Sequence, residues 1–158
     1  MVYFAGDIDR RCWEYLTPDH GKVLANSVLW AMHGRRTVEV DGPGFLDVTC
    51  RHEDGHVCVH IVNMTNTHAM RGAIREIYPI RGLELRIRVE GPLAGEVLSL
   101  ATGQTVNTTR EGEWIRMRLP EVAVHEAIVF TLESDGRLRA GETAISAIYS
   151  FEGVSGST

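Results

Sequence analysis

Most of the chain alternates apolar with polar residues, which is the pattern of strands that bury one face. The clearest run is 83–89, where Leu, Leu, Ile and Val alternate with Glu and Arg. Further strands are predicted at 38–40, 46–52, 57–63, 97–100, 104–108, 115–119 and 127–132. About eight short strands with regular turns predict a mainly β protein built as an antiparallel β-sandwich.

The hairpin of residues 46–66, LDVTCRHEDGHVCVHIVNMTN, has two possible registers. A two-residue loop at Asp54-Gly55 pairs Val57, Val59 and Ile61 with residues 52, 50 and 48, so apolar side chains share one face. A three-residue loop would instead gather all the cysteines and histidines on one face. It would place Val59 and Ile61 opposite polar residues, and each apolar side chain left unburied would lower the stability by roughly 1.5–3 kcal/mol. Burial favours the first register.

Cysteine and histidine are the residue types that bind zinc, and ligands of one zinc ion must lie on the same face of the hairpin. The register therefore decides whether this hairpin can bind zinc. The candidate ligands are Cys50, His52, His56, Cys58 and His60. The favoured register divides them between two faces. We therefore predict no metal site and no stoichiometric zinc, with small core cysteines and surface or hydrogen-bonded histidines instead.

The N-terminal segment has a different pattern. Residues 2–5 form a short apolar run that predicts a buried strand, followed by a polar loop. Thr17-Pro18-Asp19 suits the start of a helix, and apolar residues at helical spacing continue to Gly34. This strand-loop-helix unit is typical of an α/β domain, whose other strands would precede it. The alternative is that the helix packs on the β domain that follows.

Three regions are thus expected: residues 1–33 as a C-terminal βα unit of an α/β domain, 34–133 as the β-sandwich, and 134–158 as a variable, partly disordered tail. An apolar patch at 144–151 in the tail predicts a short helix or an added edge strand. Residues 65–78 are expected to form a long loop.

Composition limits the function classes. The 158 residues carry a formal net charge of −5, and no basic block offsets it, which argues against nucleic-acid and anionic-membrane partners. Three cysteines, Cys12, Cys50 and Cys58, are too few for a disulfide scaffold, and no signal peptide or membrane-length apolar run is present. A reducing, cytoplasmic location is the expectation.

Candidate catalytic groups are weak. Asp7 and Asp9 lie beside Arg10 and Arg11, so structural ion pairs are favoured over paired catalytic carboxylates. Asp19, His20 and Ser27 do not form a recognisable triad, since no G-x-S-x-G elbow is present. No glycine-rich phosphate loop occurs either. We predict no catalytic residue and no cofactor.

Three tryptophans could stack on a sugar ring. They are Trp13, Trp30 and Trp114, and Trp30 lies on the apolar stripe of the predicted helix, so it is expected to pack in a core. Trp114 lies on the arginine-bearing face of its strand, so it is the candidate carbohydrate contact.

Several longer stretches resemble one family. VYFAGDIDRRCWEYLTPDHGKVLANSVLWA looks like the last strand and helix of the amidotransferase-like trimerisation domain of bacterial β-galactosidase-like glycoside hydrolases. GPGFLDVTCRHEDGHVCVHIVNMTN and RGAIREIYPI resemble the small β-sandwich that closes those chains. The resemblance covers roughly residues 2–132.

The resemblance implies a C-terminal fragment of such an enzyme. In that family the catalytic carboxylates lie on an N-terminal TIM barrel, which this chain has no room for, so no catalytic residue carries over. The expected role is a non-catalytic accessory or assembly region of a carbohydrate-active protein, with self-association or parent-enzyme domains as partners. The alternatives are a carbohydrate-binding module and a free-standing hydrolase.

Overall fold

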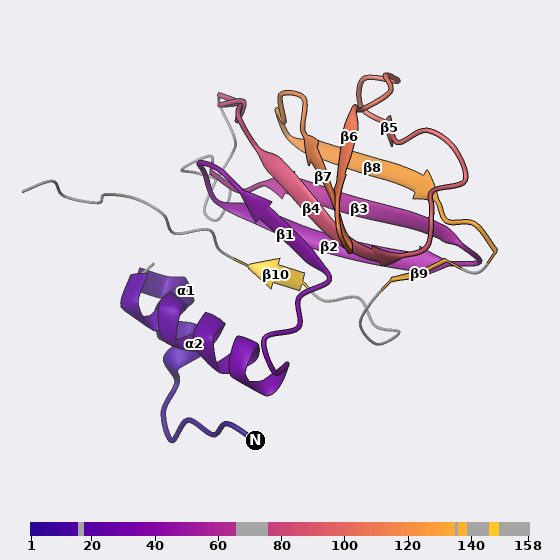
Figure 1. Ribbon diagram of the computed structural model, residues 1–158. Coiled ribbons are helices and arrows are strands. Elements are labelled where there is room, and N and C mark those ends of the chain that lie inside the picture. Colours follow the sequence, from indigo (N-terminus) through magenta and orange to yellow (C-terminus); the bar gives the residue numbers. More distant parts are fainter. Residues whose placement is uncertain (16–17, 66–75, 135, 139–145, 149–158) are drawn as a thin grey trace, which may run out of the picture. The chain divides into compact units, whose positions relative to one another are not determined.

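The computed structural model describes residues 1–15, 18–65, 76–134, 136–138 and 146–148. These fall into two units, one within residues 1–36 and one within residues 37–150. The first is helical and the second is built from two sheets (Figure 1). None of the helices in the described part is long and apolar enough to cross a membrane.

The first unit contains α1 (Ile8–Tyr15) and α2 (Pro18–Ala31). The predicted helix from Pro18 is confirmed, and it ends where the Gly34 amide donates to the Leu29 carbonyl at 2.8 Å. The predicted strand at 2–5 is wrong, because these residues have no strand partner and Tyr3 is 83% exposed. An isolated strand leaves its backbone groups unpaired.

The polar stretch after this segment is also helical rather than a loop. Asp7 precedes α1, and its carbonyl accepts a hydrogen bond from the Arg11 amide at 3.0 Å. Asp9 lies in the first turn, where a carboxylate interacts favourably with the helix dipole. Aspartate before the first turn is a helix-start signal, so the sequence contained the evidence for this helix.

The second unit contains ten strands in the described part. Their bounds are β1 (Val38–Asp41), β2 (Leu46–Glu53), β3 (His56–Asn63), β4 (Glu84–Glu90), β5 (Leu98–Ser99), β6 (Thr108–Glu111), β7 (Trp114–Arg118), β8 (His125–Thr131), β9 (Arg137–Leu138) and β10 (Ser146–Ile148). One sheet has the order β1-β4-β7-β6, with β9 also paired to β4, and the other has the order β10-β2-β3-β8-β5. Every pairing is antiparallel.

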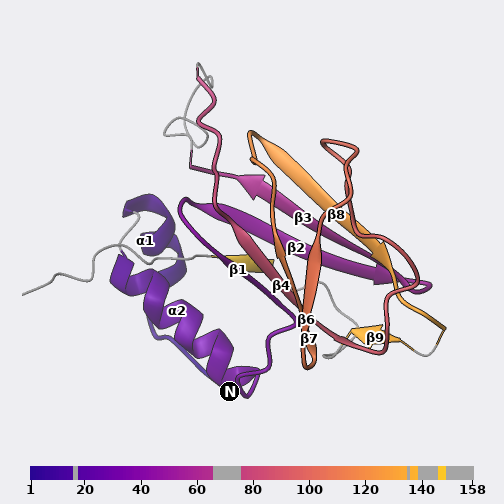
Figure 2. The ribbon, with the colours of Figure 1, turned by 45° about the horizontal axis from the view of Figure 1, so that its top comes forward.

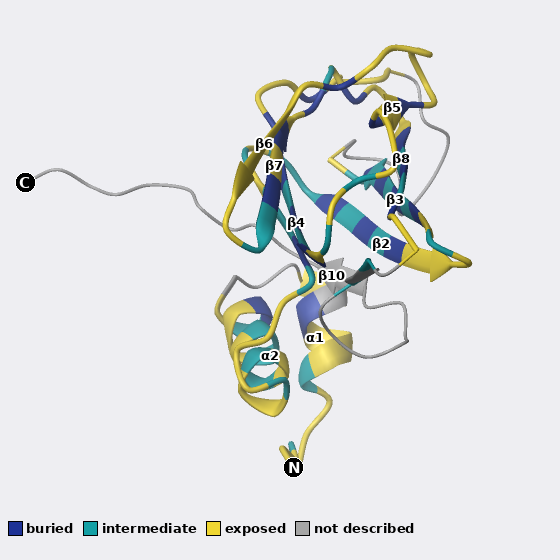
Figure 3. Ribbon diagram, turned by 45° about the vertical axis from the view of Figure 1, so that its right-hand side comes forward, coloured by how far each residue is buried: buried dark blue, intermediate teal, exposed yellow. Residues whose placement is uncertain are grey.

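The two sheets lie as two layers (Figures 1 and 2), and their inner faces supply the core. Buried positions recur along the strands of both sheets (Figure 3). From the first sheet the core takes residues such as Leu85, Ile87 and Met117, and from the second it takes residues such as Val59 and Ile61. The predicted antiparallel β-sandwich is therefore confirmed.

The hairpin of β2 and β3 adopts the register that burial favoured. Val57 pairs with His52, Val59 with Cys50, and Ile61 with Val48. Asp54 and Gly55 form the loop with φ of 48° and 79°. Two successive positive φ values are the requirement of the type I′ turn, which matches the twist of a tight hairpin.

Outside this hairpin the prediction is less complete. Residues 104–107 do not form a regular strand, and Thr108 begins β6. The predicted hairpin is present in part, because an isolated bridge joins Thr105 to Leu98 and the Val106 amide donates to the Val97 carbonyl at 2.8 Å. Strands β6 and β9 were not predicted. Within the apolar patch of the tail, residues 146–148 pair with β2, so the edge-strand alternative is confirmed there. Residues 66–75 of the expected loop, and residues 135, 139–145 and 149–158 of the tail, lie outside the described residues.

Candidate functional site

Trp114, the candidate carbohydrate contact, lies on the outer face of the first sheet at the start of β7. Its neighbours across the sheet are Arg88 on β4 and Glu111 on β6. The guanidinium carbons of Arg86 and Arg88 lie 6.0 and 5.9 Å from the centre of the indole ring. These distances suit cation–π attraction. The indole is half-buried, so a sugar would approach a ring that two arginines already contact.

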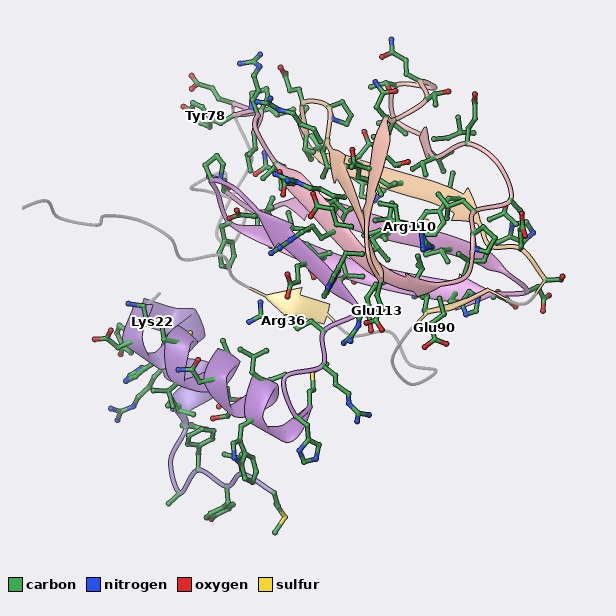
Figure 4. The ribbon with its side chains drawn as sticks, in the orientation of Figure 1. Lys22, Arg36, Tyr78, Glu90, Arg110 and Glu113 are labelled. Atoms are coloured by element: carbon green, nitrogen blue, oxygen red, sulfur yellow. The ribbon has the colours of Figure 1, made fainter. Side chains whose placement is uncertain are left out.

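The face around Trp114 is a network of ion pairs. Arg86 Nη2 lies 2.7 Å from a carboxylate oxygen of Glu39, and Arg116 Nη2 lies 2.6 Å from one of Glu84. Arg88 donates from Nε and Nη2 to a single Glu113 oxygen at 2.8 and 2.6 Å. Glu113 comes from the β6–β7 turn (Figure 4). Charges of both signs alternate here, so this face does not favour a strongly charged ligand.

The pairing also affects protonation. The hydrogen bond from Arg116 holds the pKa of Glu84 below its usual range, and the same contact raises the pKa of Arg116. A lowered carboxyl pKa is opposite to what a general acid needs at neutral pH. Glu84 is therefore poorly suited to proton donation.

The Cys/His hairpin gives a second group of polar side chains, on the outer face of the second sheet. Cys58 Sγ lies 3.3 Å from His60 Nε2, and His60 Nδ1 lies 3.1 Å from His125 Nε2. The rings of His60 and His125 stack with centroids 5.3 Å apart and planes 14° apart. His56 Nδ1 instead lies 3.0 Å from Thr131 Oγ1. His125 comes from β8, and no local pattern in the sequence linked it to the hairpin.

The two hairpin cysteines have different environments. Cys50 faces the core, and burial raises the pKa of its thiol to about 11. Cys58 faces outward and is half-buried; burial raises its pKa and the charge of Arg51 opposes that rise. No group of three or more His, Cys, Asp or Glu side chains in the described part is placed to hold an ion in common.

A buried carboxylate was missed by the sequence analysis. Glu126 on β8 is fully buried, and it accepts hydrogen bonds from Ser99 Oγ at 2.8 Å and from the backbone amides of Ala127 and Ala101 at 2.8 and 3.2 Å. Ser99 Oγ accepts in turn from the amide and hydroxyl of Thr102. The strand was predicted at 127–132. Extending its alternation back by one residue places Glu126 on the same face as the buried apolar residues, so the sequence pattern could have predicted that Glu126 is buried.

The remaining predicted candidates lie in the first unit. Asp7 forms an ion pair with Arg10 at 3.2 Å, which agrees with a structural role. The Ser27 hydroxyl donates to the Val23 carbonyl of its own helix at 2.7 Å, so it is occupied locally. Trp30 is 63% exposed rather than packed in a core, and the side chain of Trp13 lies outside the described part.

Comparison with known proteins places the fold. No family model matches the sequence, and no curated protein matches it. Among solved structures, the chain is similar to part of alpha-L-fucosidase isoenzyme 2 from Paenibacillus thiaminolyticus, with a TM-score of 0.67 and 12% identity. The match covers 84% of this chain and 21% of the fucosidase chain.

The chain is thus a β-sandwich protein by fold, and its sandwich is similar to one that occurs within a glycoside hydrolase. An identity of 12% shows the fold alone. The chain corresponds to about a fifth of the fucosidase, so that enzyme's activity does not transfer to it directly.

Proposed function

We propose that this chain is a non-catalytic accessory region of a carbohydrate-active protein of glycoside-hydrolase type. The observation that carries the proposal is the fold similarity over 84% of this chain to one part of a fucosidase. Fold similarity alone does not assign an activity. The evidence against catalysis is the environment of the glutamate side chains in the β-sandwich.

Glycoside hydrolysis generally uses two carboxyl groups on either side of an accessible sugar. On the outer face of the first sheet, Glu39, Glu84 and Glu113 are each paired with an arginine. Glu126 is fully buried and accepts hydrogen bonds in the core, so no sugar can reach it. These carboxylates are suited to structural roles.

The finer proposal is that the parent protein is β-galactosidase-like and that the first unit serves assembly. The sequence resemblance to the trimerisation domain supports it. So do the exposed apolar side chains of this unit, which include Tyr3, Val28 and Trp30. Exposed large apolar side chains favour association where they form a patch.

Two measurements test this proposal. The purified chain should show no turnover of nitrophenyl galactosides or fucosides above a blank, and activity that survives repurification would contradict a non-catalytic role.

Light scattering should show species larger than a monomer. Tyr3→Ser with Trp30→Ser should shift them toward monomer, whereas Leu100→Ser, at an exposed sandwich position, should not. A clean monomer with a protease-resistant N-terminus would refute assembly through this unit.

The second candidate is carbohydrate binding at Trp114. The half-buried indole with two adjacent guanidinium groups offers one stacking surface and several hydrogen-bond donors. Affinity gels and calorimetry with galactosides and plant polysaccharides test it. A saturable signal that Trp114→Ala abolishes and Trp30→Ala leaves unchanged would support this candidate, and no signal in the wild type would exclude it for those sugars.

A further inference from the structure

One edge of β2 carries backbone groups that point away from β3. Just beyond the last residue pair of the hairpin, the Met64 amide donates to the Phe45 carbonyl at 2.8 Å. Hydrogen-bonded and non-hydrogen-bonded pairs alternate along an antiparallel ladder, so residues 47, 49, 51 and 53 bond to β3. The amides and carbonyls of residues 46, 48, 50 and 52 therefore face the opposite edge of the strand.

Strand β10 covers only part of this edge. Its three residues pair with Asp47, Val48 and Thr49, whereas β2 has eight residues. In the part of the chain that the structure describes, no other strand pairs with this side of β2. An open strand edge is a template for a further strand, and proteins limit such pairing by covering the edge. The cover provided by β10 is short compared with the edge beneath it.

The sequence of β2 is complementary to itself in one antiparallel register. When Thr49 lies opposite Thr49 of a second copy, Asp47 lies opposite Arg51 of that copy, and Arg51 lies opposite its Asp47. Asp47 and Arg51 are four residues apart, so both lie on the same face of the strand. Opposite charges across a ladder stabilise it and like charges destabilise it. A shift by two residues opposes Asp47 either to Glu53, a like charge, or to the neutral Thr49.

We propose that β10 is a guard strand, which prevents β2 from pairing with β2 of a second copy in this register. Loss of β10 from the edge produces a two-fold symmetric dimer with two Asp47–Arg51 pairs. Such a contact uses the same surface on both copies, so it closes after two chains and does not extend into a fibre. This contact is separate from association through the first unit, so the test uses the Tyr3→Ser, Trp30→Ser background throughout.

Two changes release the edge in that background. Ala147→Pro removes the amide of the residue that pairs with Val48, and a stop codon after Leu138 removes β10 entirely. Sedimentation over a concentration series should show a dimer that dissociates at least about tenfold less readily in both variants than in the background chain. Ala147→Ser keeps the amide and should behave as the background chain does. Because all chains share one background, the change caused by loss of β10 is measured whether or not the first unit associates.

Charge reversal tests the register in the chain that ends at Leu138. Arg51→Asp replaces two attractive pairs by two repulsive pairs and should weaken the dimer at least about tenfold. Adding Asp47→Arg restores opposite charges across the interface and should recover the dimer. Circular dichroism and thermal melts verify that each variant is folded.

Disulfide trapping tests the position of the two-fold axis. Thr49→Cys in the chain that ends at Leu138 places two thiols in a non-hydrogen-bonded pair, whose Cα atoms lie about 4.5 Å apart, which a disulfide can span. With Cys58→Ser to remove the nearby outward-facing thiol, this variant should form a disulfide-linked dimer on oxidation, and Glu53→Cys should not. A folded chain without β10 that stays monomeric, or equal cross-linking at positions 49 and 53, would overturn the proposal.

Discussion

The buried carboxylate of Glu126 provides the sharpest test of the packing. Its side chain is fully buried and accepts three hydrogen bonds, from Ser99 Oγ and from the amides of Ala101 and Ala127. Ser99 is itself fully buried and links this carboxylate to the turn at Thr102. We expect Glu126 to hold the β5 turn against β8.

Replacement by leucine removes all three acceptors. The Ala101 amide is near solvent and can bond to water, but the Ser99 hydroxyl and the Ala127 amide are buried. A buried donor without a partner costs about 1–3 kcal/mol, so Glu126→Leu should lower the free energy of unfolding by about 3–5 kcal/mol.

Glutamine makes a finer perturbation at nearly the same volume. Its carbonyl oxygen can still accept from the Ala127 and Ala101 amides, but its NH₂ group would face Ser99 Oγ, which already accepts two hydrogen bonds from Thr102. The serine hydroxyl also loses its acceptor. We expect Glu126→Gln to lower the free energy of unfolding by about 1–2 kcal/mol.

Urea unfolding followed by circular dichroism measures both effects. Glu133→Gln is the matched control, because Glu133 is exposed, and it should change stability by less than about 0.5 kcal/mol. The reasoning is refuted if the glutamine and leucine variants both unfold at the same urea concentration as the control.

Two further predictions concern the hairpin and its end. At pH 8 a thiol reagent should modify Cys58 well before Cys50. The thiolate is the nucleophile, and a pKa of about 11 leaves the Cys50 thiol almost wholly protonated. Mass spectrometry of the labelled protein measures the order of modification, and a faster reaction at Cys50 would contradict the prediction. Asn63 donates from Nδ2 to the Tyr78 and Ala123 carbonyls at 2.8 and 2.9 Å. Asn63→Asp replaces this donor with an acceptor that faces the two carbonyls. The substitution should lower the free energy of unfolding by about 2–4 kcal/mol in the same urea assay. Equal stability of Asn63→Asp and wild type would show that these bonds are not needed.

Local chemistry accounts for what the sequence predicted well. Alternation along 46–63 and the Asp54-Gly55 turn determined the hairpin register, because a shift by one residue would move each valine and isoleucine to the opposite face. The same alternation predicted β4 and β7 and the face on which Trp114 lies. By contrast, the apolar run at 2–5 did not form a strand, since a strand depends on a partner that periodicity does not reveal.

The sequence by itself thus determined the sandwich class, its central hairpin and the outward placement of Trp114. Only the tertiary structure placed His125 beside His60, 65 residues earlier, and buried Glu126 against Ser99, 27 residues earlier. It also added residues 146–148 to the edge of β2. The physical reason is that side-chain alternation depends on neighbours in the chain, whereas strand order depends on pairings between distant segments, which leave no local pattern.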